Sequence, residues 1–427
     1  MTSAPVHYIG NKSRLLEPIA EAVAALLTDV GEVVDLFSGS GVVTARLSNL
    51  APVVSIDIQH YSGTLARAQT SAFELDVDAW ISAAESLSGE YSRRPGVSAI
   101  LAHEARALQG DDALLIEMLE SGSGMARMHA PRELDTALGS SLREAARHRR
   151  LGEGVLFHYY SGPYFGYAQG IALDALSVAA RALPSSGARD TATAIILGIA
   201  SELATSVGNH FAQPLKVRDR SGAVKTSHIR RAASKREVDL WARVRKQALR
   251  YSNAKESPHP ISTFTGDFRA ALDTRVRAGS VIYADPPYTR DHYSRFYHVL
   301  ETIVLGDEPG FALLPGRGVP RGLYRQERHQ SDFSIVSRAP KAFESLFAQA
   351  HRLAAPVVLS YSPVDHQSSK PRSRAAALAS IVDIAQRTGY SVEVRPVEGV
   401  QHSRFNSARH SVPAPVAAES LIIASPL

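Results

Sequence analysis

The tetrapeptide Asp285-Pro286-Pro287-Tyr288 is the part of this sequence best suited to chemistry. It follows the apolar run VIYA, and the chain must turn outward there because proline has no N–H to continue a strand ladder. The turn would project Asp285 and Tyr288 from the carboxyl edge of a sheet, where open α/β sheets bind ligands. A carboxylate and a backbone carbonyl at that edge can accept the N–H bonds of an exocyclic amine on an aromatic base, so that the nitrogen lone pair faces a methyl donor. A tyrosine beside them can stack on a base flipped out of a duplex. An ordinary proline-rich loop after a strand is the alternative.

The segment DLFSGSG (35–41) is a second candidate site, a glycine-rich turn between an apolar run and a helical pattern. Gly39 and Gly41 would let the backbone pass close to a ligand, and the following helix would offer free N–H groups. The spacing matches neither the G-x-G-x-x-G of dinucleotide binders nor the Gly-Lys-Ser/Thr of a P-loop, so we expect a cofactor that joins an amino acid to a nucleoside. Asp57, at the end of the next apolar run, is placed to accept two ribose hydroxyls. A plain strand–helix turn with an unrelated acid is the alternative.

These motifs lie on alternating strand and helix patterns typical of a doubly wound α/β sheet. Between about residues 62 and 252 the sequence becomes Ala-rich and charged, with long helical patterns and hardly any strand-like runs. We therefore predict a Rossmann-like sheet split by a large, mainly helical insertion; three consecutive domains are the alternative. Residues 305–335 are punctuated by Gly and Pro and predict a long loop. Apolar runs predict strands at 32–37, 52–58, 280–288, 356–363, 391–397 and 419–426, and helical spacing predicts helices at 14–28 and 42–51.

Composition narrows the class of protein. The 427 residues are 44% hydrophobic, which is enough for a substantial core. No apolar run reaches the ~18 residues needed to span a membrane, and no signal-peptide pattern opens the chain, so we expect a cytoplasmic protein. The chain has no cysteine, which excludes disulfides and thiolate metal sites. Its histidines show no pair at metal-ligand spacing, so we expect no metal.

The charge distribution suggests a polyanionic partner. The formal net charge is +5, and Lys and Arg greatly outnumber Asp and Glu between residues 214 and 250. As phosphate contacts these side chains would give salt-sensitive affinity that depends little on sequence; a solvated helix face is the alternative. The candidate basic residues are Lys216, Arg218, Arg220, Lys225, Arg230, Arg231, Lys235 and Arg236, followed by Arg290, His292 and Arg295 after the tetrapeptide and by His402, Arg404 and Arg409 near the end. The aromatic residues Tyr159, Tyr160 and Phe165 are expected in the core.

Four segments, in this order, resemble the Dam-like (D12 class) adenine-N6 DNA methyltransferases. They are HYIGNKSRLL (7–16), DLFSGSG with SIDI, TFTGDF (263–268) and ADPPY. The resemblance covers about 1–70 and 255–427, while 70–150 match no family segment and Asn11 stands where many relatives have glycine. The family's motif order implies a cofactor-binding part at 1–70, a target-recognition region at 71–254 and a catalytic part at 255–427.

The resemblance implies S-adenosyl-L-methionine as cofactor and no metal. It implies that Tyr8 and Lys12 touch the cofactor and that Asp267 meets its adenine. The implied cofactor-binding residues are Tyr8, Lys12, Asp35, Phe37, Gly39, Ser40, Gly41, Asp57, Asp267 and Phe268, and the implied catalytic residues are Asp285, Pro286, Pro287 and Tyr288.

We therefore predict an adenine-specific DNA methyltransferase that flips its target base out of duplex DNA, as enzymes of restriction–modification do. It would act in a prokaryotic cytoplasm, at the nucleoid when bound to DNA. The alternatives are an RNA adenine-N6 methyltransferase and a non-catalytic DNA-binding protein on the same fold; a Rossmann oxidoreductase is disfavoured because G-x-G-x-x-G is absent. The residues predicted to contact nucleic acid are Lys216, Arg218, Arg230, Arg231, Arg290 and Arg295.

Overall fold

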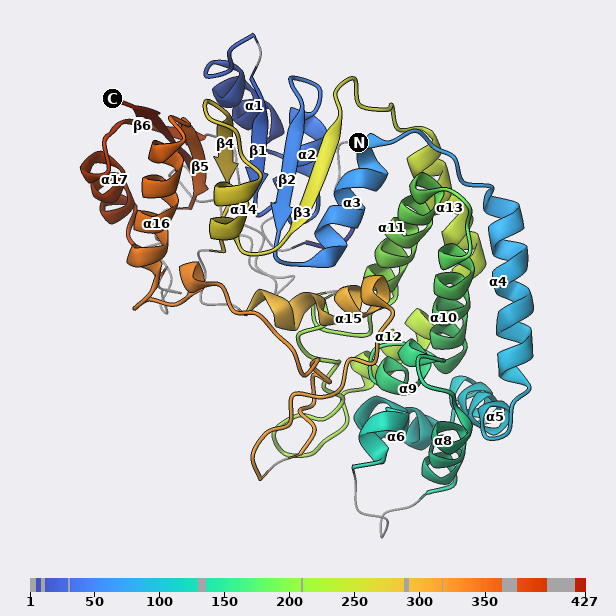
Figure 1. Ribbon diagram of the computed structural model, residues 1–427. Helices are drawn as coiled ribbons and strands as arrows, with labels where there is room; N and C mark the ends of the chain where they lie inside the picture. The colour runs from blue at the N-terminus through green and yellow to red at the C-terminus, as the bar shows by residue number, and fades with distance from the viewer. Residues whose placement is uncertain are drawn as a thin grey trace.

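A mixed sheet forms the centre of the fold in this computed structural model (Figure 1). The structure describes residues 5–8, 12–29, 31–129, 136–208, 210–287, 292–316, 318–362, 375–397 and 419–427. The strands are β1 (Val33–Leu36), β2 (Val53–Asp57), β3 (Ile261–Thr265), β4 (Val281–Ala284), β5 (Val357–Tyr361), β6 (Tyr390–Val397) and β7 (Glu419–Pro426). Within the described residues these seven strands pair in the order β3-β2-β1-β4-β5-β7-β6. Neighbours from β3 to β5 run parallel, and β7 runs antiparallel to both β5 and β6.

The strand order places the carboxyl ends of β1 and β4 side by side. Leu36 at the end of β1 pairs with Ala284 at the end of β4 and with Ile56 of β2. The chain proceeds outward from β1 to β2 and β3 on one side, and from β4 to β5 on the other. The order therefore reverses between β1 and β4, which is where open α/β sheets bind ligands. The segments that follow β1, β2 and β4 meet at this edge.

Helices cover both faces of the sheet. α1 (Leu16–Ala24), α2 (Val42–Leu47) and α3 (His60–Thr70) lie on one face, and α14 (Phe268–Thr274), α16 (Ala339–Arg352) and α17 (Leu378–Arg387) on the other. Along β1, Val33 packs with α1 and α2, whereas Val34 and Leu36 pack with α14 and α16, because successive side chains point to opposite faces. Burial on both faces explains why β1 and β4 are almost entirely apolar. The predicted doubly wound α/β sheet is confirmed.

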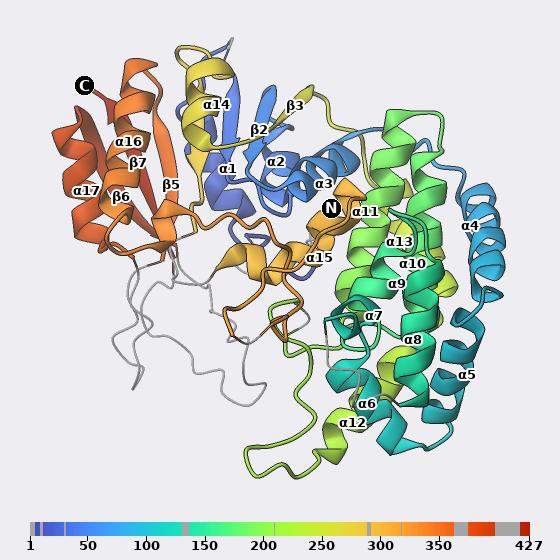
Figure 2. The same cartoon turned by 60° about the horizontal axis from the view of Figure 1, so that its bottom comes forward.

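A helical insertion separates α3 from β3, and Figure 2 shows it beside the sheet. Its described residues form isolated bridges but no strand. One continuous core joins its central helices to α3 and to α15 (Tyr293–Leu305), and the predicted core aromatics Tyr159, Tyr160 and Phe165 are buried in it. The predicted large, mainly helical insertion is confirmed, and it packs directly on α15, the helix that follows the tetrapeptide 285–288. Its helices are α4 (Val77–Ser92), α5 (Val97–Leu108), α6 (Asp112–Ser121), α7 (Gly124–Arg127), α8 (Ala137–His148), α9 (Val155–Tyr160), α10 (Tyr167–Arg181), α11 (Ser186–Leu203), α12 (Thr226–Arg236) and α13 (Leu240–Ser252).

Several elements differ from the sequence-based expectation. Residues 261–265 form strand β3, which was not predicted because this edge strand is half exposed and lacks a continuous apolar run. Helix α1 covers 16–24 rather than 14–28, and α2 covers 42–47 rather than 42–51. Strand β4 covers 281–284 rather than 280–288. The segment 305–335 is the predicted long loop, with one 3₁₀ turn, η2 (Asp332–Ser334). None of the helices in the described parts of the chain has the length and apolar character needed to cross a membrane.

Candidate active site

A pocket lies where the chain leaves β1, β2 and β4. Its lining combines residues from the beginning of the chain with residues more than two hundred positions later, which the sheet brings to one edge. The predicted site residues that line it are Tyr8, Phe37, Asp57, Asp267, Phe268, Asp285, Pro286 and Pro287. Tyr288 lies outside the described residues.

Hydrogen bonds fasten the glycine-rich turn after β1 to the end of β2. The N–H of Phe37 donates to the carbonyl of Ile56 at 2.9 Å, and the N–H of Gly39 donates to Oδ2 of Asp57 at 2.9 Å. Gly39 has a φ of 52°, and a Cβ there would lie 2.8 Å from the ring of Tyr8. Glycine at this position therefore allows Tyr8 to lie directly on the turn and form a wall of the pocket.

Other residues of this motif support the turn from outside the pocket lining. Asp35 is buried and accepts a hydrogen bond from Oγ1 of Thr44 in α2 at 2.5 Å; its burial raises its pKa to about 7. Gly41 has a φ of 75° and precedes α2, and a Cβ there would lie 2.9 Å from the backbone of Ala66 in α3. The close neighbour at this glycine is therefore α3, and contacts of Asp35, Ser40 and Gly41 with a cofactor stay predictions.

Asp57 presents a carboxylate to the pocket. Its Oδ1 accepts the N–H of Gln59 at 2.9 Å, and its Oδ2 accepts the N–H of Gly39. Burial raises the pKa of Asp57 to about 6, although these two N–H groups oppose the shift. Each carboxylate oxygen has a second lone pair, so Asp57 can still accept two adjacent hydroxyl groups.

Three phenylalanine rings form a wall of the pocket. Phe37 lies edge-on to Phe333 with 5.3 Å between ring centroids, and tilted to Phe268 at 5.7 Å. Such rings offer a planar apolar surface on which a purine can stack. Phe333 was not predicted, because it lies in the irregular segment 305–335, which has no periodicity from which its direction could be inferred.

Asp267 is fixed at the rim of this wall. Its side chain accepts the N–H of Arg269 at the start of α14, at 2.9 Å. The guanidinium of Arg269 pairs with Asp267 at 3.3 Å and with Asp332 of η2 at 3.2 Å. The ion pairs join the segment before β4 to the loop that carries Phe333, and all of these residues line the pocket.

A group of three charged side chains includes the candidate catalytic carboxylate. Nζ of Lys12 lies 3.2 Å from Oδ1 of Asp285 and also contacts Oε1 of Glu419, the first residue of β7. Lys12 and Glu419 are 5% and 3% exposed. Burial raises the pKa of Asp285 to about 7; Lys12 lowers it and Glu419 raises it further. Lys12 was predicted to touch the cofactor, but the structure places it against Asp285 and outside the pocket lining. Glu419 was not predicted.

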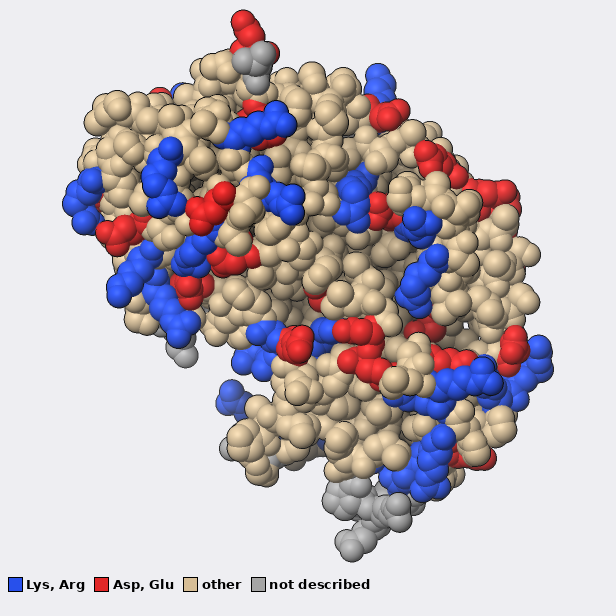
Figure 3. All heavy atoms as spheres, in the orientation of Figure 1, with Lys and Arg blue, Asp and Glu red and all other residues tan. Residues whose placement is uncertain are grey.

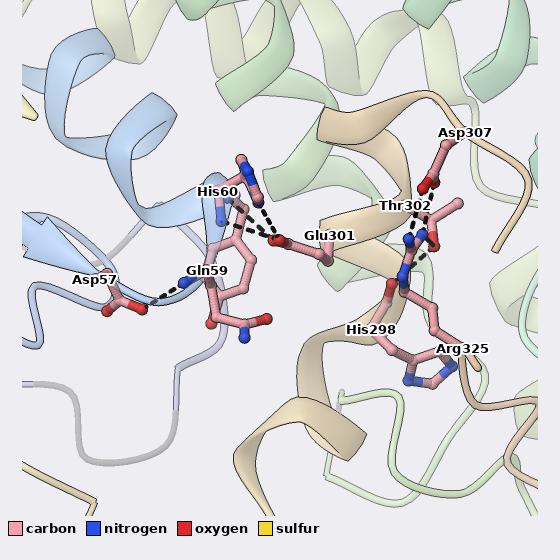
Figure 4. Close-up of polar contacts among 9 residues, drawn as sticks. Asp57, Gln59, His60, His298, Glu301, Thr302, Asp307 and Arg325 are labelled. Atoms are coloured by element: carbon pink, nitrogen blue, oxygen red, sulfur yellow. Dashed lines mark hydrogen bonds and ion pairs between the residues drawn. The ribbon is translucent and has the colours of Figure 1, made fainter. Parts of the chain in front are cut away.

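Helix α15 supports the site from the side of the insertion (Figure 4). Oε1 of Glu301 accepts the backbone N–H of His60 at 3.0 Å and contacts its Nδ1 at 2.7 Å, and Oε2 accepts the N–H of Tyr61 at 3.3 Å. Glu301 therefore caps α3, the helix that begins just after Asp57. Glu301 was missed, because nothing in its apolar helical surroundings identifies a partner 240 positions away.

Some of the basic residues predicted to contact DNA are exposed, and others form ion pairs or hydrogen bonds within the protein. Lys216, Arg230 and Arg231 are exposed, and Arg218 pairs with Glu120 at 3.0 Å. Figure 3 shows basic side chains interspersed with acidic ones on the face it presents. Arg295 is exposed on α15, whereas Arg290, His402, Arg404 and Arg409 lie outside the described residues.

Two members of the basic run bond within the protein, and Arg236 is wrong as a phosphate contact. Arg236 is buried, donates to the carbonyl of Gly162 and pairs with Glu104 at 3.7 Å. Lys235 is half-buried and donates to the carbonyl of Glu202, and burial lowers its pKa. Within the described ranges, no group of three or more His, Asp or Glu side chains could hold a metal ion.

Comparison with known proteins places these features in a family. The sequence profile of the D12 class N6 adenine-specific DNA methyltransferases matches residues 8–96 and 227–352. The modification methylase LlaI of Lactococcus lactis subsp. lactis is 37% identical over 136 residues. That alignment covers 31% of this chain and 19% of the relative, so it spans about a fifth of that protein's length. The profile covers about half of the chain and includes β1, β2, β3 and β4 with the pocket between them. The chain therefore belongs to the D12 class N6 adenine-specific DNA methyltransferase family.

Proposed function

We propose that this protein transfers a methyl group from S-adenosyl-L-methionine to the N6 amino group of adenine in duplex DNA. The observation that carries the proposal is that Asp285, at the end of β4, and Asp57, at the end of β2, line one pocket. Asp57 can accept hydrogen bonds from the ribose of the methyl donor, and Asp285 can accept them from the exocyclic amine of the methyl acceptor. One pocket can therefore hold both molecules of the reaction.

The residues of the pocket fit the proposed cofactor. Asp57 has acceptor capacity for the two ribose hydroxyls, and the rings of Phe37, Phe268 and Phe333 form a surface for its adenine. Asp267, at the rim of that surface, has acceptors for an adenine amino group. When bound, S-adenosyl-L-methionine supplies a methyl group on a positively charged sulfur, which a nitrogen lone pair can displace.

Asp285 would orient and deprotonate the acceptor nitrogen. The lone pair of an exocyclic adenine nitrogen is delocalised into the ring, so the amine is a poor nucleophile until its N–H bonds are held. We assign those hydrogen bonds to the carboxylate of Asp285 and to a backbone carbonyl of the Pro286-Pro287 turn. As the N–C bond forms, one N6 proton must leave; Asp285, with its pKa raised to about 7, can accept it and release it to water. Tyr288 would stack on the flipped base.

The insertion, residues 71–254, is the part of the chain that we assign to target recognition. It packs on α15, the helix that follows the catalytic tetrapeptide, so DNA held by the insertion would lie beside the pocket. Lys216, Arg230 and Arg231 are exposed there and can meet phosphates. Action on chromosomal DNA would place the enzyme in the cytoplasm of a prokaryotic cell.

A methyl-transfer assay with tritiated S-adenosyl-L-methionine tests the proposal. The enzyme is incubated with plasmid DNA and, separately, with total RNA, and the labelled nucleosides are separated after digestion. We expect label in N6-methyladenine from DNA. Label in RNA alone would favour the RNA methyltransferase instead. Cofactor binding measured by calorimetry without any transfer would favour the non-catalytic DNA-binding protein.

A further inference from the structure

Two arginine side chains share one aromatic ring beside the pocket. The guanidinium carbon of Arg295 in α15 lies 5.5 Å from the ring centroid of Tyr324, and that of Arg328 lies 5.2 Å from the same centroid. The hydroxyl of Tyr324 donates to the carbonyl of Ala212 at 2.5 Å, so the ring itself is fixed to the insertion. Two like charges therefore lie near one ring, and Arg295 lowers the pKa of Arg328 after the larger effect of burial.

The charge of Arg328 is not balanced by the described part of the protein. Nε and Nη1 of Arg328 are buried atoms without a hydrogen-bond partner among the residues that the structure describes. Burial lowers the pKa of Arg328, and Arg295 lowers it further, whereas no carboxylate in that part of the chain opposes this shift. A buried guanidinium nitrogen without an acceptor is costly and is rarely left so in native proteins.

Two other arginines of the same loop have acceptors for their guanidinium groups. Arg325 pairs with both carboxylate oxygens of Asp307 at 2.7 Å and donates to Thr302 (Figure 4). Arg321 donates to the carbonyl of Leu215 at 2.9 Å. These two arginines fasten the loop to α15 and to the insertion. Nε and Nη1 of Arg328 have no such acceptor within the described ranges, and the side chain as a whole is partly exposed.

Residues next to the pair in the chain reach the pocket. His329, next in the chain to Arg328, lines the pocket together with Ser294, which neighbours Arg295. Burial lowers the pKa of His292 to about 4, and Arg295, Arg328 and His329 add to this shift, so that His292 is neutral at pH 7. An anion beside these groups would lie at the mouth of the methyl-transfer pocket.

We propose that Arg295 and Arg328 bind a backbone phosphate of the strand that carries the target adenine. The inference rests on the proposed function, since a nucleotide with its base in the pocket must keep its phosphates just outside it. Arginine suits this role because its planar fork gives two parallel hydrogen bonds to a phosphate. The phosphate would supply a balancing charge for the pair.

Salt dependence of DNA binding gives the first test. Affinity for a fluorescent duplex of mixed sequence is measured by anisotropy at increasing salt for the wild type, Arg328→Gln, Arg328→Lys and Arg387→Gln. Loss of one phosphate contact should reduce the slope of log K against log salt by about 0.9 and weaken binding roughly tenfold or more. We expect this for Arg328→Gln, whereas Arg328→Lys should keep most of the slope. The control Arg387 is 63% exposed and pairs with Asp383 on α17. Equal slopes in Arg328→Gln and Arg387→Gln would overturn the proposal.

Position on the strand gives the second test. Once the methylated adenine has been mapped, duplexes are made in which a neutral methylphosphonate replaces each phosphate around it in turn. One substitution next to the target adenine should weaken the wild type but leave Arg328→Gln unaffected. Equal sensitivity of the two proteins at every position would contradict the proposal while the methyltransferase assignment stood. Absence of any methyl transfer by the wild type would refute the proposed function itself.

Discussion

Removing either of the two charges that act on Asp285 should shift the pH dependence of catalysis, and the two shifts should be opposite. Lys12 lowers the pKa of Asp285 and Glu419 raises it, so the contributions can be separated by Lys12→Met and Glu419→Gln. In the proposed mechanism Asp285 must be ionised to accept the N6 hydrogen bonds. The acid limb of kcat/KM should therefore follow its pKa, which burial places at about 7.

The distances set the size of the shifts. At the 3.2 Å between Nζ of Lys12 and Oδ1 of Asp285, unit charges in an effective dielectric of about 20 interact by about 5 kcal/mol, an upper bound. Opposite charges in proteins typically lower a carboxyl pKa by about 1–3 units. Lys12→Met should move the acid limb upward by that amount, to about pH 8–10. Glu419→Gln should move it downward, by about one unit, since Glu419 contacts Lys12 and acts on Asp285 from farther away.

The assay is the initial rate of methyl transfer at sub-saturating DNA from about pH 5 to 10, within the range where the fold remains intact by circular dichroism. Breaking a buried ion pair typically costs about 3–5 kcal/mol of stability, so a thermal unfolding curve accompanies each variant. Glu17→Gln is the matched control, because Glu17 is 69% exposed and pairs with Arg46 on the surface. Shifts of both variants in the same direction, or shifts equal to that of Glu17→Gln, would refute this account of the three charges.

Four further predictions follow from the site. Asp285→Ala should abolish methyl transfer but change the calorimetric Kd for the cofactor only a few-fold, and full activity would contradict the catalytic assignment. Tyr288→Phe should keep methyl transfer and Tyr288→Ala should lose it, because stacking needs the ring. Equal rates of tritiated-methyl transfer by these two variants would argue against stacking. Gly39→Ala should weaken cofactor binding at least tenfold, since a left-handed residue with a Cβ costs about 1–2 kcal/mol and the ring of Tyr8, which lines the pocket and would lie 2.8 Å from the new Cβ, must shift. Asp35→Asn should stabilise the protein at pH 8 by up to about 4 kcal/mol, because burial raises the pKa of Asp35 to about 7, so the wild type loses stability as pH rises from about 4 to 7. The two proteins should unfold at the same urea concentration below about pH 4, and a variant that is less stable at pH 8 would show that the charge of Asp35 is compensated.

The sheet could be predicted because its central strands are buried on both faces. That burial requires the continuous apolar runs that identify β1, β2, β4 and β5 in the sequence. The segments after β1, β2 and β4, which carry predicted site residues, meet in the pocket. The edge strand β3 gave no such signal, since half of its surface faces solvent.

Long-range contacts could not be predicted from local patterns. Lys12 and Glu419 are 407 positions apart, and no spacing rule relates them. The wrong prediction that Arg236 contacts phosphate could have been avoided from the sequence. Ile229, Ala232 and Arg236 are buried together on α12, and their spacing of three and four positions is typical of one helix face. The positive charge of Arg236 indicates a surface residue, whereas the face that it shares with Ile229 and Ala232 indicates a buried one.

Mapping of methylated adenines in a living host tests the central claim most directly. The chain is expressed in a bacterial host without adenine methylation, and its genome is read by single-molecule sequencing, with Asp285→Ala expressed in parallel. The account predicts N6-methyladenine at one enriched sequence motif in the wild type and none in the variant. Unmodified DNA in cells that contain folded protein, or equal modification by Asp285→Ala, would contradict it.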